Sequence, residues 1–305
     1  MTAPQDEALA EHTRAVLAQM AAAPPRLRSV MAAAVRHLHA FAEEVELTPQ
    51  EWLAGIAFLT QVGQICSADR QEFILLSDTL GLSTTVNLLH DRSVEGVVPG
   101  AHLATESSLL GPFFRERAPQ LPLGASIARH SSGPEIQLYG RVTGLDGRPL
   151  QNAQVQVWQT DADGAYDLQV HGLEIMDMRG VFCTDDEGRY YLRSLRPASY
   201  PLPSDGPVRR LLNAQRRHGM RPAHIHFLIT ADGHDELVTA LYLAGDAYLD
   251  SDTVFGVAAS LVVQLEDDPA APVQGVPAIR RDFVLLPSSG GGHGRVGADA
   301  STLTA

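Results

Sequence analysis

Cysteine is scarce in this chain of 305 residues, which contains only two, Cys66 and Cys183. Two cysteines that lie so far apart in the sequence cannot form the disulfide framework that holds many small secreted proteins together. The acidic N-terminus, from Met1 to Glu7, also lacks the basic and then apolar pattern of a signal peptide. A reducing compartment fits both observations, and we expect a cytoplasmic location.

Positive charge is also in short supply, because 23 basic residues stand against 36 acidic ones, for a formal net charge of -13. A chain this acidic is not expected to bind nucleic acid or an anionic membrane surface. Long apolar runs are missing as well, since none approaches the roughly 18 residues that a membrane-spanning helix needs. We therefore expect neither a nucleic-acid partner nor insertion into a membrane.

Helical patterns fill the first part of the chain. The sequence Thr48-Pro49-Gln50-Glu51 predicts a capping box, with Thr48 at the N-cap and Glu51 three positions later. Apolar residues then recur at steps of four and three and predict one face of a helix: Trp52, Ile56, Leu59, Val62 and Cys66. Further helices are expected over residues 7–20, 28–44 and 71–80. We interpret residues 1–110 as a helical domain that is a scaffold or joins two copies of the chain.

Short β-type runs separated by turns replace the helical pattern after about Gly111. Strands fit residues 137–142, 153–158, 189–192, 223–229, 237–243 and 281–286, and D-G or E-G turns lie between several of them. Such runs without long intervening helices favour an antiparallel sandwich or barrel. The expected fold class is α+β, with an antiparallel β-sandwich over residues 111–287 after the helical domain. Residues 288–305 are rich in glycine, and we expect them to be disordered.

Two histidines stand inside an apolar run, in the stretch from Arg221 to Phe227. His224 and His226 are two residues apart, so on a strand both imidazoles point from the same face. A pair of neutral nitrogen donors side by side is what a metal site needs. The alternative is a pair of imidazoles that form hydrogen bonds within a β core.

The companions of the pair decide between metals. Zinc would need a third histidine, a cysteine pair or a carboxylate at a typical spacing, and Asp232 and Asp235 fall in a turn. A facial-triad Fe(II) site typically uses a His-x-carboxylate pair with a distant histidine. Phenolate oxygens suit Fe(III), and two tyrosines lie in unusual places: Tyr166 after a strand and turn, and Tyr200 in a proline-rich loop. From the chemistry alone, tyrosine ligation remains one hypothesis among these.

Several motifs, taken together and in order, resemble a known family. They are Leu110-Gly111-Pro112-Phe113, residues 140–158, Asp163-Gly164-Ala165-Tyr166, residues 184–190, Tyr200-Pro201, Asp205-Gly206-Pro207, Arg217-His218-Gly219 and residues 221–227. Over about residues 30–286 the chain is similar to the intradiol ring-cleavage dioxygenases. These are non-haem Fe(III) enzymes that use O2 to open catechol-type rings between the two hydroxyls.

The resemblance implies an iron site and two catalytic roles. Carried over by position, the four protein ligands of Fe(III) would be Tyr166, Tyr200, His224 and His226. Tyr200 would leave the iron when substrate binds and help to accept its proton. Arg221 would lie beside the substrate and stabilise negative charge on the ring, a role that suits an always cationic guanidinium.

The same resemblance implies a substrate class. The N-terminal region is similar to that of the catechol and hydroxyquinol 1,2-dioxygenases, which implies a homodimer joined by these helices, with a lipid-like molecule as a further partner. Residues 166–169 and 249–256 look closer to the hydroxyquinol branch. We expect cleavage of hydroxyquinol (benzene-1,2,4-triol) to a muconate or maleylacetate-type product in aromatic degradation. Catechol, or an alkyl or chloro catechol, is the alternative substrate.

Substrate-binding positions are also carried over from the family: Leu80, Leu110, Gly111, Pro112, Phe113, Pro201 and Ala240. Ala240 departs from the family, which often has glutamine there, and this change could widen the pocket, shift substrate preference or lower activity. A non-enzyme alternative is a prealbumin-like β-sandwich that binds carbohydrate or protein, since residues 140–157 also fit such a module. That module would need neither the tyrosines nor the histidine pair.

Overall fold

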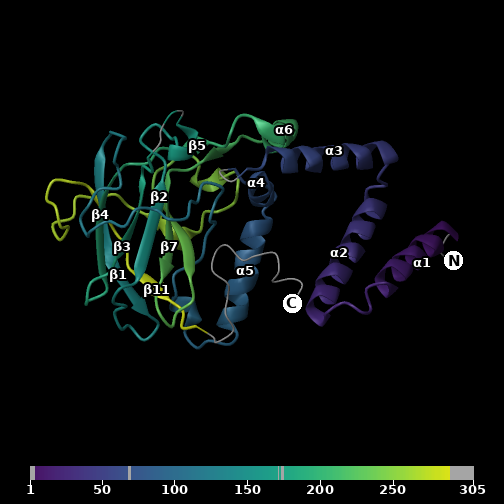
Figure 1. Cartoon of the computed structure of the whole chain (residues 1–305), viewed down its shortest axis with the longest axis horizontal. Helices are drawn as coiled ribbons and strands as arrows, with labels where there is room; N and C mark the ends of the chain where they lie inside the picture. Colours follow the sequence, from purple (N-terminus) through teal and green to yellow (C-terminus); the bar gives the residue numbers. More distant parts are fainter. Residues whose placement is uncertain (1–3, 68–69, 171, 173–174, 289–305) are drawn as a thin grey trace. The chain divides into compact units, whose positions relative to one another are not determined.

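The computed structural model describes residues 4–67, 70–170, 172 and 175–288 (Figure 1). By contact, the described chain falls into two compact units, one up to Thr60 and the other from Gln61 onward. A domain boundary after residue 110 stays a prediction, and helices α4 and α5 of the helical region belong to the second unit. Apart from Ser288, the tail over residues 288–305 that we expect to be disordered lies outside the described residues.

Helices make up the first unit. Helix α1 covers Pro4–Ala18, α2 covers Pro25–Glu44, and α3 begins at Pro49 and ends at Ile65, inside the second unit. The capping box at the start of α3 is confirmed, because the Thr48 amide donates to Glu51 Oε2 at 2.9 Å and the Glu51 amide donates to Thr48 Oγ1 at 3.3 Å. The Thr48 hydroxyl also donates to Glu51 Oε2, and the bonds from the Thr48 amide and hydroxyl lower the pKa of Glu51. The described helices include none long and apolar enough to cross a membrane.

The second unit begins with a helical layer. Helix α4 covers Glu72–Thr79, α5 covers Leu82–Glu95, and a short 3-10 turn, η1, follows at Ala101–Leu103. Gly81 joins α4 to α5 with φ 74°, a left-handed conformation that glycine adopts at little cost. A separate helix over α5 was not predicted from the sequence.

Two sheets form the rest of the unit. The first contains β1 (Glu135–Gly144), β4 (Arg189–Leu195), β10 (Ala278–Arg280) and β11 (Phe283–Leu285). The second runs β3 (Arg179–Cys183), β2 (Gln154–Gln159), β7 (His224–Thr230), β8 (Leu237–Leu243) and β9 (Val262–Val263). The long strands pair antiparallel, as predicted. The short strands β9, β10 and β11 pair parallel to their neighbours, so both sheets are mixed.

The two sheets enclose a hydrophobic core, and the residues that β7 contributes to it show which face of this strand points inward. Ile225, Phe227 and Ile229 belong to this core. Because side chains alternate along a strand, His224 and His226 lie on the other face of the same sheet. In Figure 1, α4 and α5 lie on the side of β7 that faces away from β1 and β4.

Loops between the strands carry short elements near this outer face. The turn η2 covers Asp167–Gln169, helix α6 covers Gly206–Ala214, and the turns η3 and η4 cover Leu249–Ser251 and Ala259–Leu261. Two-residue strands β5 (Tyr200–Pro201) and β6 (Met220–Arg221) pair with each other and bring Tyr200 opposite Arg221.

Candidate active site

The histidine pair on β7 is the centre of a buried polar cluster. His224 and His226 are almost fully buried, and their Nε2 atoms lie 3.0 Å apart. The Nδ1 atom of His224 lies 2.7 Å from the carbonyl oxygen of Pro222, which can only accept. We therefore assign the proton to Nδ1, which leaves the Nε2 lone pair of His224 directed into the cluster.

Neighbouring strands hold the two rings in place. Trp158 on β2 lies opposite His226 and stacks on it, with ring centroids 4.9 Å apart and planes 5° from parallel. Ala240 and Tyr242 on β8 lie opposite His226 and His224. Residues opposite each other in a sheet share a face, so all five side chains belong to the outer face.

The two predicted tyrosines come from separate loops and lie beside the histidine pair. Tyr166 and Tyr200 are both buried, with ring centroids 5.4 Å apart and nearly perpendicular planes. The Tyr200 ring lies 5.6 Å from the His224 ring. The Tyr166 hydroxyl is buried and forms no hydrogen bond with the described residues. Since a buried hydroxyl without a partner costs free energy, this oxygen is suited to a ligand that the chain itself does not supply.

Two predicted substrate positions pack closely on the cluster. The Phe113 ring stacks on Tyr166, with centroids 4.4 Å apart. Gly111 has φ 74°, and a Cβ atom there would lie 3.4 Å from the His226 ring. A side chain at position 111 would therefore be strained and would press on a proposed metal ligand.

Arg221 is the positive charge of the cluster. It is buried and forms an ion pair with Asp252, whose Oδ1 lies 3.1 Å from Nε and whose Oδ2 lies 3.2 Å from Nη2. Its Nη1 lies 3.1 Å from His224 Nε2 and 3.5 Å from the Tyr200 hydroxyl. The guanidinium thus touches a histidine and a tyrosine of the cluster at once.

Burial and this charge shift the pKa values of the cluster. Burial lowers the pKa of His224 and of His226 well below the usual value, and the charge of Arg221 lowers both further. Burial also raises the pKa of Tyr166 well above its usual value, and the Tyr200 phenol adds to that shift. For Arg221, burial alone would lower the pKa, but Asp252, Tyr200 and Tyr242 raise it above its usual value. The histidines are therefore neutral donors and Arg221 stays charged.

The donor set distinguishes between metals. Among the described residues, no group of three or more His, Cys, Asp or Glu side chains could hold a metal ion. Zinc and facial-triad Fe(II) sites use such groups. The cluster instead offers two neutral imidazole nitrogens and two phenol oxygens, one of them without a partner. These residues fit a trivalent iron, because its charge favours the ionised form of a phenol.

The remaining predicted substrate positions lie in different surroundings. Leu110 and Pro112 are half-buried beside Gly111, and Ala240 is buried opposite His226. Leu80 is 60% exposed and Pro201 is also exposed. The structure brings Gly111, Phe113 and Ala240 to the cluster, and it places Leu80 and Pro201 at the surface.

Three residues of the site were not predicted. Asp252 pairs with Arg221, Trp158 stacks on His226, and Asp78 on α4 is buried where the charges of Arg221 and Asp252 act on it. Burial raises the pKa of Asp78. An acid within the apolar stretch from Phe73 to Leu80 is a signal in the sequence, but Asp252 lies in an acidic loop and shows no such contrast.

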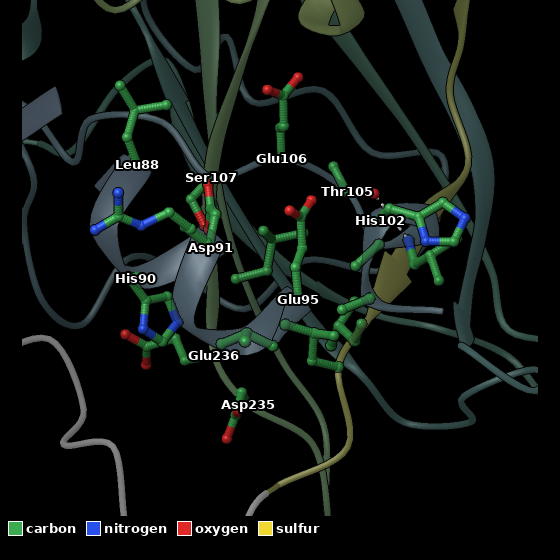
Figure 2. Close-up of a pocket in the computed structure, with 18 residues that line it drawn as sticks. Leu88, His90, Asp91, Glu95, His102, Thr105, Glu106, Ser107, Asp235 and Glu236 are labelled. Atoms are coloured by element: carbon green, nitrogen blue, oxygen red, sulfur yellow. Dashed lines mark hydrogen bonds between the residues drawn. The ribbon is translucent and has the colours of Figure 1, made fainter. Parts of the chain in front are cut away.

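A separate cavity of about 240 Å³ lies between α5, residues 101–107, the start of β8 and the end of β11. Figure 2 shows acidic side chains around it, among them Asp91, Glu95 and Glu106, with His90 and His102. Burial raises the pKa of Asp91, and Glu106 and Glu95 raise it further. None of the cluster residues described above lines this cavity.

Comparison with known proteins identifies the family. A family model described as "Dioxygenase" matches residues 109–287, and one described as "Catechol dioxygenase N terminus" matches residues 24–97. The chain is 47% identical over 277 residues to 6-chlorohydroxyquinol 1,2-dioxygenase of Cupriavidus pinatubonensis, covering 90% of this chain and 96% of that protein. It is 42% identical over 270 residues to hydroxyquinol 1,2-dioxygenase of a Rhizobium species, covering 86% and 89%. The chain belongs to the intradiol ring-cleaving dioxygenases.

A solved structure supports the same conclusion for the fold. The crystal structure of hydroxyquinol 1,2-dioxygenase from Pseudomonas putida has a TM-score of 0.81 and 39% identity, and the match covers 93% of this dioxygenase and 100% of that chain. The family and the α+β fold predicted from the motifs are thus confirmed. The prediction that this dioxygenase is an enzyme is confirmed with them.

Proposed function

We propose that this dioxygenase cleaves hydroxyquinol, or a substituted hydroxyquinol, between its two adjacent hydroxyls. The observation that carries the proposal is the 47% identity over most of the chain to a protein named for 6-chlorohydroxyquinol. Insertion of both atoms of O2 would give a muconate-type diacid or its maleylacetate tautomer. Catechol is the second candidate, since a catechol 1,2-dioxygenase structure from an Acinetobacter species matches with a TM-score of 0.77 at 30% identity.

We further propose that Fe(III) is the cofactor and that Tyr166, Tyr200, His224 and His226 hold it. The unpartnered Tyr166 hydroxyl and the facing Nε2 atoms support this assignment. When bound, the iron would draw electron density from a chelated diol and so make its ring reactive toward O2. The two ionised phenols would offset much of the charge of the metal, and the two imidazoles would add neutral donors.

The chain's own residues would bind the substrate and move its protons. Tyr200 Oη would accept a proton from a substrate hydroxyl, because it is the tyrosine that touches Arg221. The Nη1 group of Arg221 would stabilise negative charge on the diol and its ring, since a buried cation acts strongly at short range. Gly111 and Ala240 would bound the ring on the side of His226 and Phe113 on the side of Tyr166, with Leu110 and Pro112 beside Gly111.

Assembly, location and domain boundary are part of the proposal. We propose a helical domain over residues 1–110 and a catalytic domain over residues 111–287, with a homodimer joined through the helices and a lipid-like molecule as a further partner. Apolar side chains on α3, including Trp52 and Ile56, are about half exposed and support such contacts. We also propose a cytoplasmic location, for which the two free cysteines, Cys66 and Cys183, are the support.

Oxygen uptake with a panel of diols tests the substrate. Purified, iron-loaded protein would be given hydroxyquinol, 6-chlorohydroxyquinol, catechol and chlorocatechols, and each product would be identified by mass. We expect the highest kcat/KM with a hydroxyquinol and a product heavier by two oxygen atoms. A higher kcat/KM with catechol would favour the second candidate. A muconic semialdehyde product would mean cleavage outside the two hydroxyls and would contradict intradiol chemistry.

A further inference from the structure

The loop after β8 contacts Arg221 through a buried ion pair. Nε and Nη2 of Arg221 donate to Oδ1 and Oδ2 of Asp252, and both side chains are only 2% exposed. The same carboxylate accepts hydrogen bonds from the backbone amide of Gly256 at 3.1 Å and from that of Val254 at 3.4 Å. Asp252 therefore fixes the guanidinium and the turn that follows it at the same time.

The direction of the guanidinium follows from this arrangement. Arg221 has five N–H donors in a rigid, planar fork. Asp252 occupies the edge formed by Nε and Nη2, so the remaining nitrogen, Nη1, points toward Tyr200 and His224. With a monodentate or neutral partner at position 252, only the single contacts to Tyr200, His224 and Tyr242 would hold the plane of the fork.

The turn itself is held from three other elements. Thr84 on α5 donates to the carbonyl of Phe255 at 3.1 Å, and Tyr242 on β8 donates to the carbonyl of Gly256 at 2.9 Å. Ser108, in the loop before β1, also donates to Gly256 at 3.1 Å. A Cβ atom on Gly256 would lie 2.7 Å from the Tyr242 hydroxyl and 3.1 Å from Arg221 Nη2. The absence of a side chain at position 256 is thus what allows the turn to approach Arg221.

We propose that Asp252 is the positioning residue for Arg221: its buried bidentate contact, anchored in the Val254–Gly256 turn, aims Nη1 at the substrate. The inference rests on the proposed role of Arg221 in diol cleavage. Asp252 does not touch the proposed metal ligands, and it acts only through the arginine. A shift of about 1 Å in such a group can lower a rate about 100-fold.

The test compares Asp252→Asn with Asp250→Asn in the iron-loaded protein. Asp250 is an exposed carboxylate in the same loop, so its variant removes the same charge without the contact to Arg221. We measure kcat per bound iron, KM for hydroxyquinol, and the dissociation constant of 4-nitrocatechol from its absorption. For Asp252→Asn we expect about a 100-fold fall in kcat per iron, with KM and analogue binding changed much less, because the lost interaction acts on developing charge.

Outcomes of this comparison separate the alternatives. A kcat per iron for Asp252→Asn equal to that of Asp250→Asn would overturn the positioning role, and so would a loss of activity that only follows a loss of bound iron. If Asp252→Asn does not fold, Gly256→Ala takes its place, and an unchanged kcat per iron in that variant would overturn the inference. A wild-type protein that consumes no O2 with any diol would instead contradict the proposed function.

Discussion

At the scale of single residues, the unpartnered Tyr166 hydroxyl is the most telling atom of the site. The ring is buried under Phe113 and beside Tyr200, yet its oxygen has no hydrogen-bond partner among the described residues. Such a group costs free energy unless something else satisfies it. A metal at this oxygen would remove the cost and would also oppose the raised pKa that burial gives to Tyr166.

Replacing His226 with alanine should remove the iron. The imidazole is one of two proposed neutral donors, and the residue that stacks on it, Trp158, has only an indole N–H, which cannot bind a metal in its place. We expect iron content, measured by elemental analysis, to fall from near one per chain to near zero. His102→Ala is the matched control, since His102 is exposed on the rim of the separate cavity. Full iron occupancy in His226→Ala would remove this residue from the ligand set.

Tyr200→Phe should keep the fold but lose part of the visible colour and most of the turnover. Phenylalanine preserves the ring packing on His224 and removes only the hydroxyl that touches Arg221. We expect weaker tyrosinate-to-iron absorption and a fall in kcat of about 100-fold, the size typical of a lost acid–base group. Tyr191→Phe on β4 is the control. Unchanged colour together with unchanged kcat would count against Tyr200 as ligand and base.

At the scale of elements, the sequence was informative wherever a pattern ran long enough. The helix after the capping box and strand β2 follow from regular spacing of apolar residues. The helix over 28–44 follows from its alanine and leucine content, and β1, β7 and β8 follow from short β-type runs between turns. Strand β3 was missed because it has only five residues and begins with Arg179 and Gly180, so it carries no apolar run that would mark a strand. Strands β5 and β6 have two residues each and carry no period at all, although they bring Tyr200 to Arg221.

Local sequence patterns also decide which site residues could be predicted. His224 and His226 are two apart on one strand, so local geometry is enough to pair them. Tyr166 and Tyr200 join them only through the fold, and they were found through resemblance to a family. Asp252 is separated from Arg221 by two strands and a loop, and no local rule connects a loop aspartate to a buried arginine.

Arg179→Ala should destabilise the element that carries Tyr166. Arg179 on β3 donates from Nε to Asp167 Oδ2 at 2.8 Å, both side chains are buried, and Asp167 directly follows Tyr166 in the sequence. In this variant only the partly exposed Arg115 would still pair with Asp167, at 3.3 Å, and removing the main partner of a buried charge typically costs about 3–5 kcal/mol. We expect a loss of this size in the free energy of unfolding, measured with urea.

Arg148→Ala provides the comparison for that measurement. Arg148 forms an ion pair with Asp146, but both side chains are largely exposed, so its removal should leave the urea midpoint almost unchanged. Equal midpoints for the two variants would mean that the Arg179–Asp167 pair does not support the loop of Tyr166.

At the scale of the whole molecule, apolar surface on α3 bears on assembly. Trp52, Ile56 and Leu59 follow one another at steps of four and three, and they are 55%, 47% and 46% exposed. The sequence predicted this stripe as one apolar face of a helix, and among the described residues of α3 only Val62 is buried. An apolar stripe on a helix is typical of a surface that packs against another helix or a lipid.

Ile56→Asp should therefore weaken a dimer formed through these helices. Placing a charge in the middle of the stripe makes its burial against a second copy costly, because an unpaired carboxylate must lose its water. Sedimentation velocity should show a shift from dimer toward monomer, with kcat per iron retained because the proposed site lies within the second unit. Gln50→Asp adds the same charge to an exposed polar position of α3, and it should leave the dimer intact. A dimer of unchanged strength in Ile56→Asp would mean that the stripe meets something other than a second copy, and lipid extraction would then test the remaining occupant.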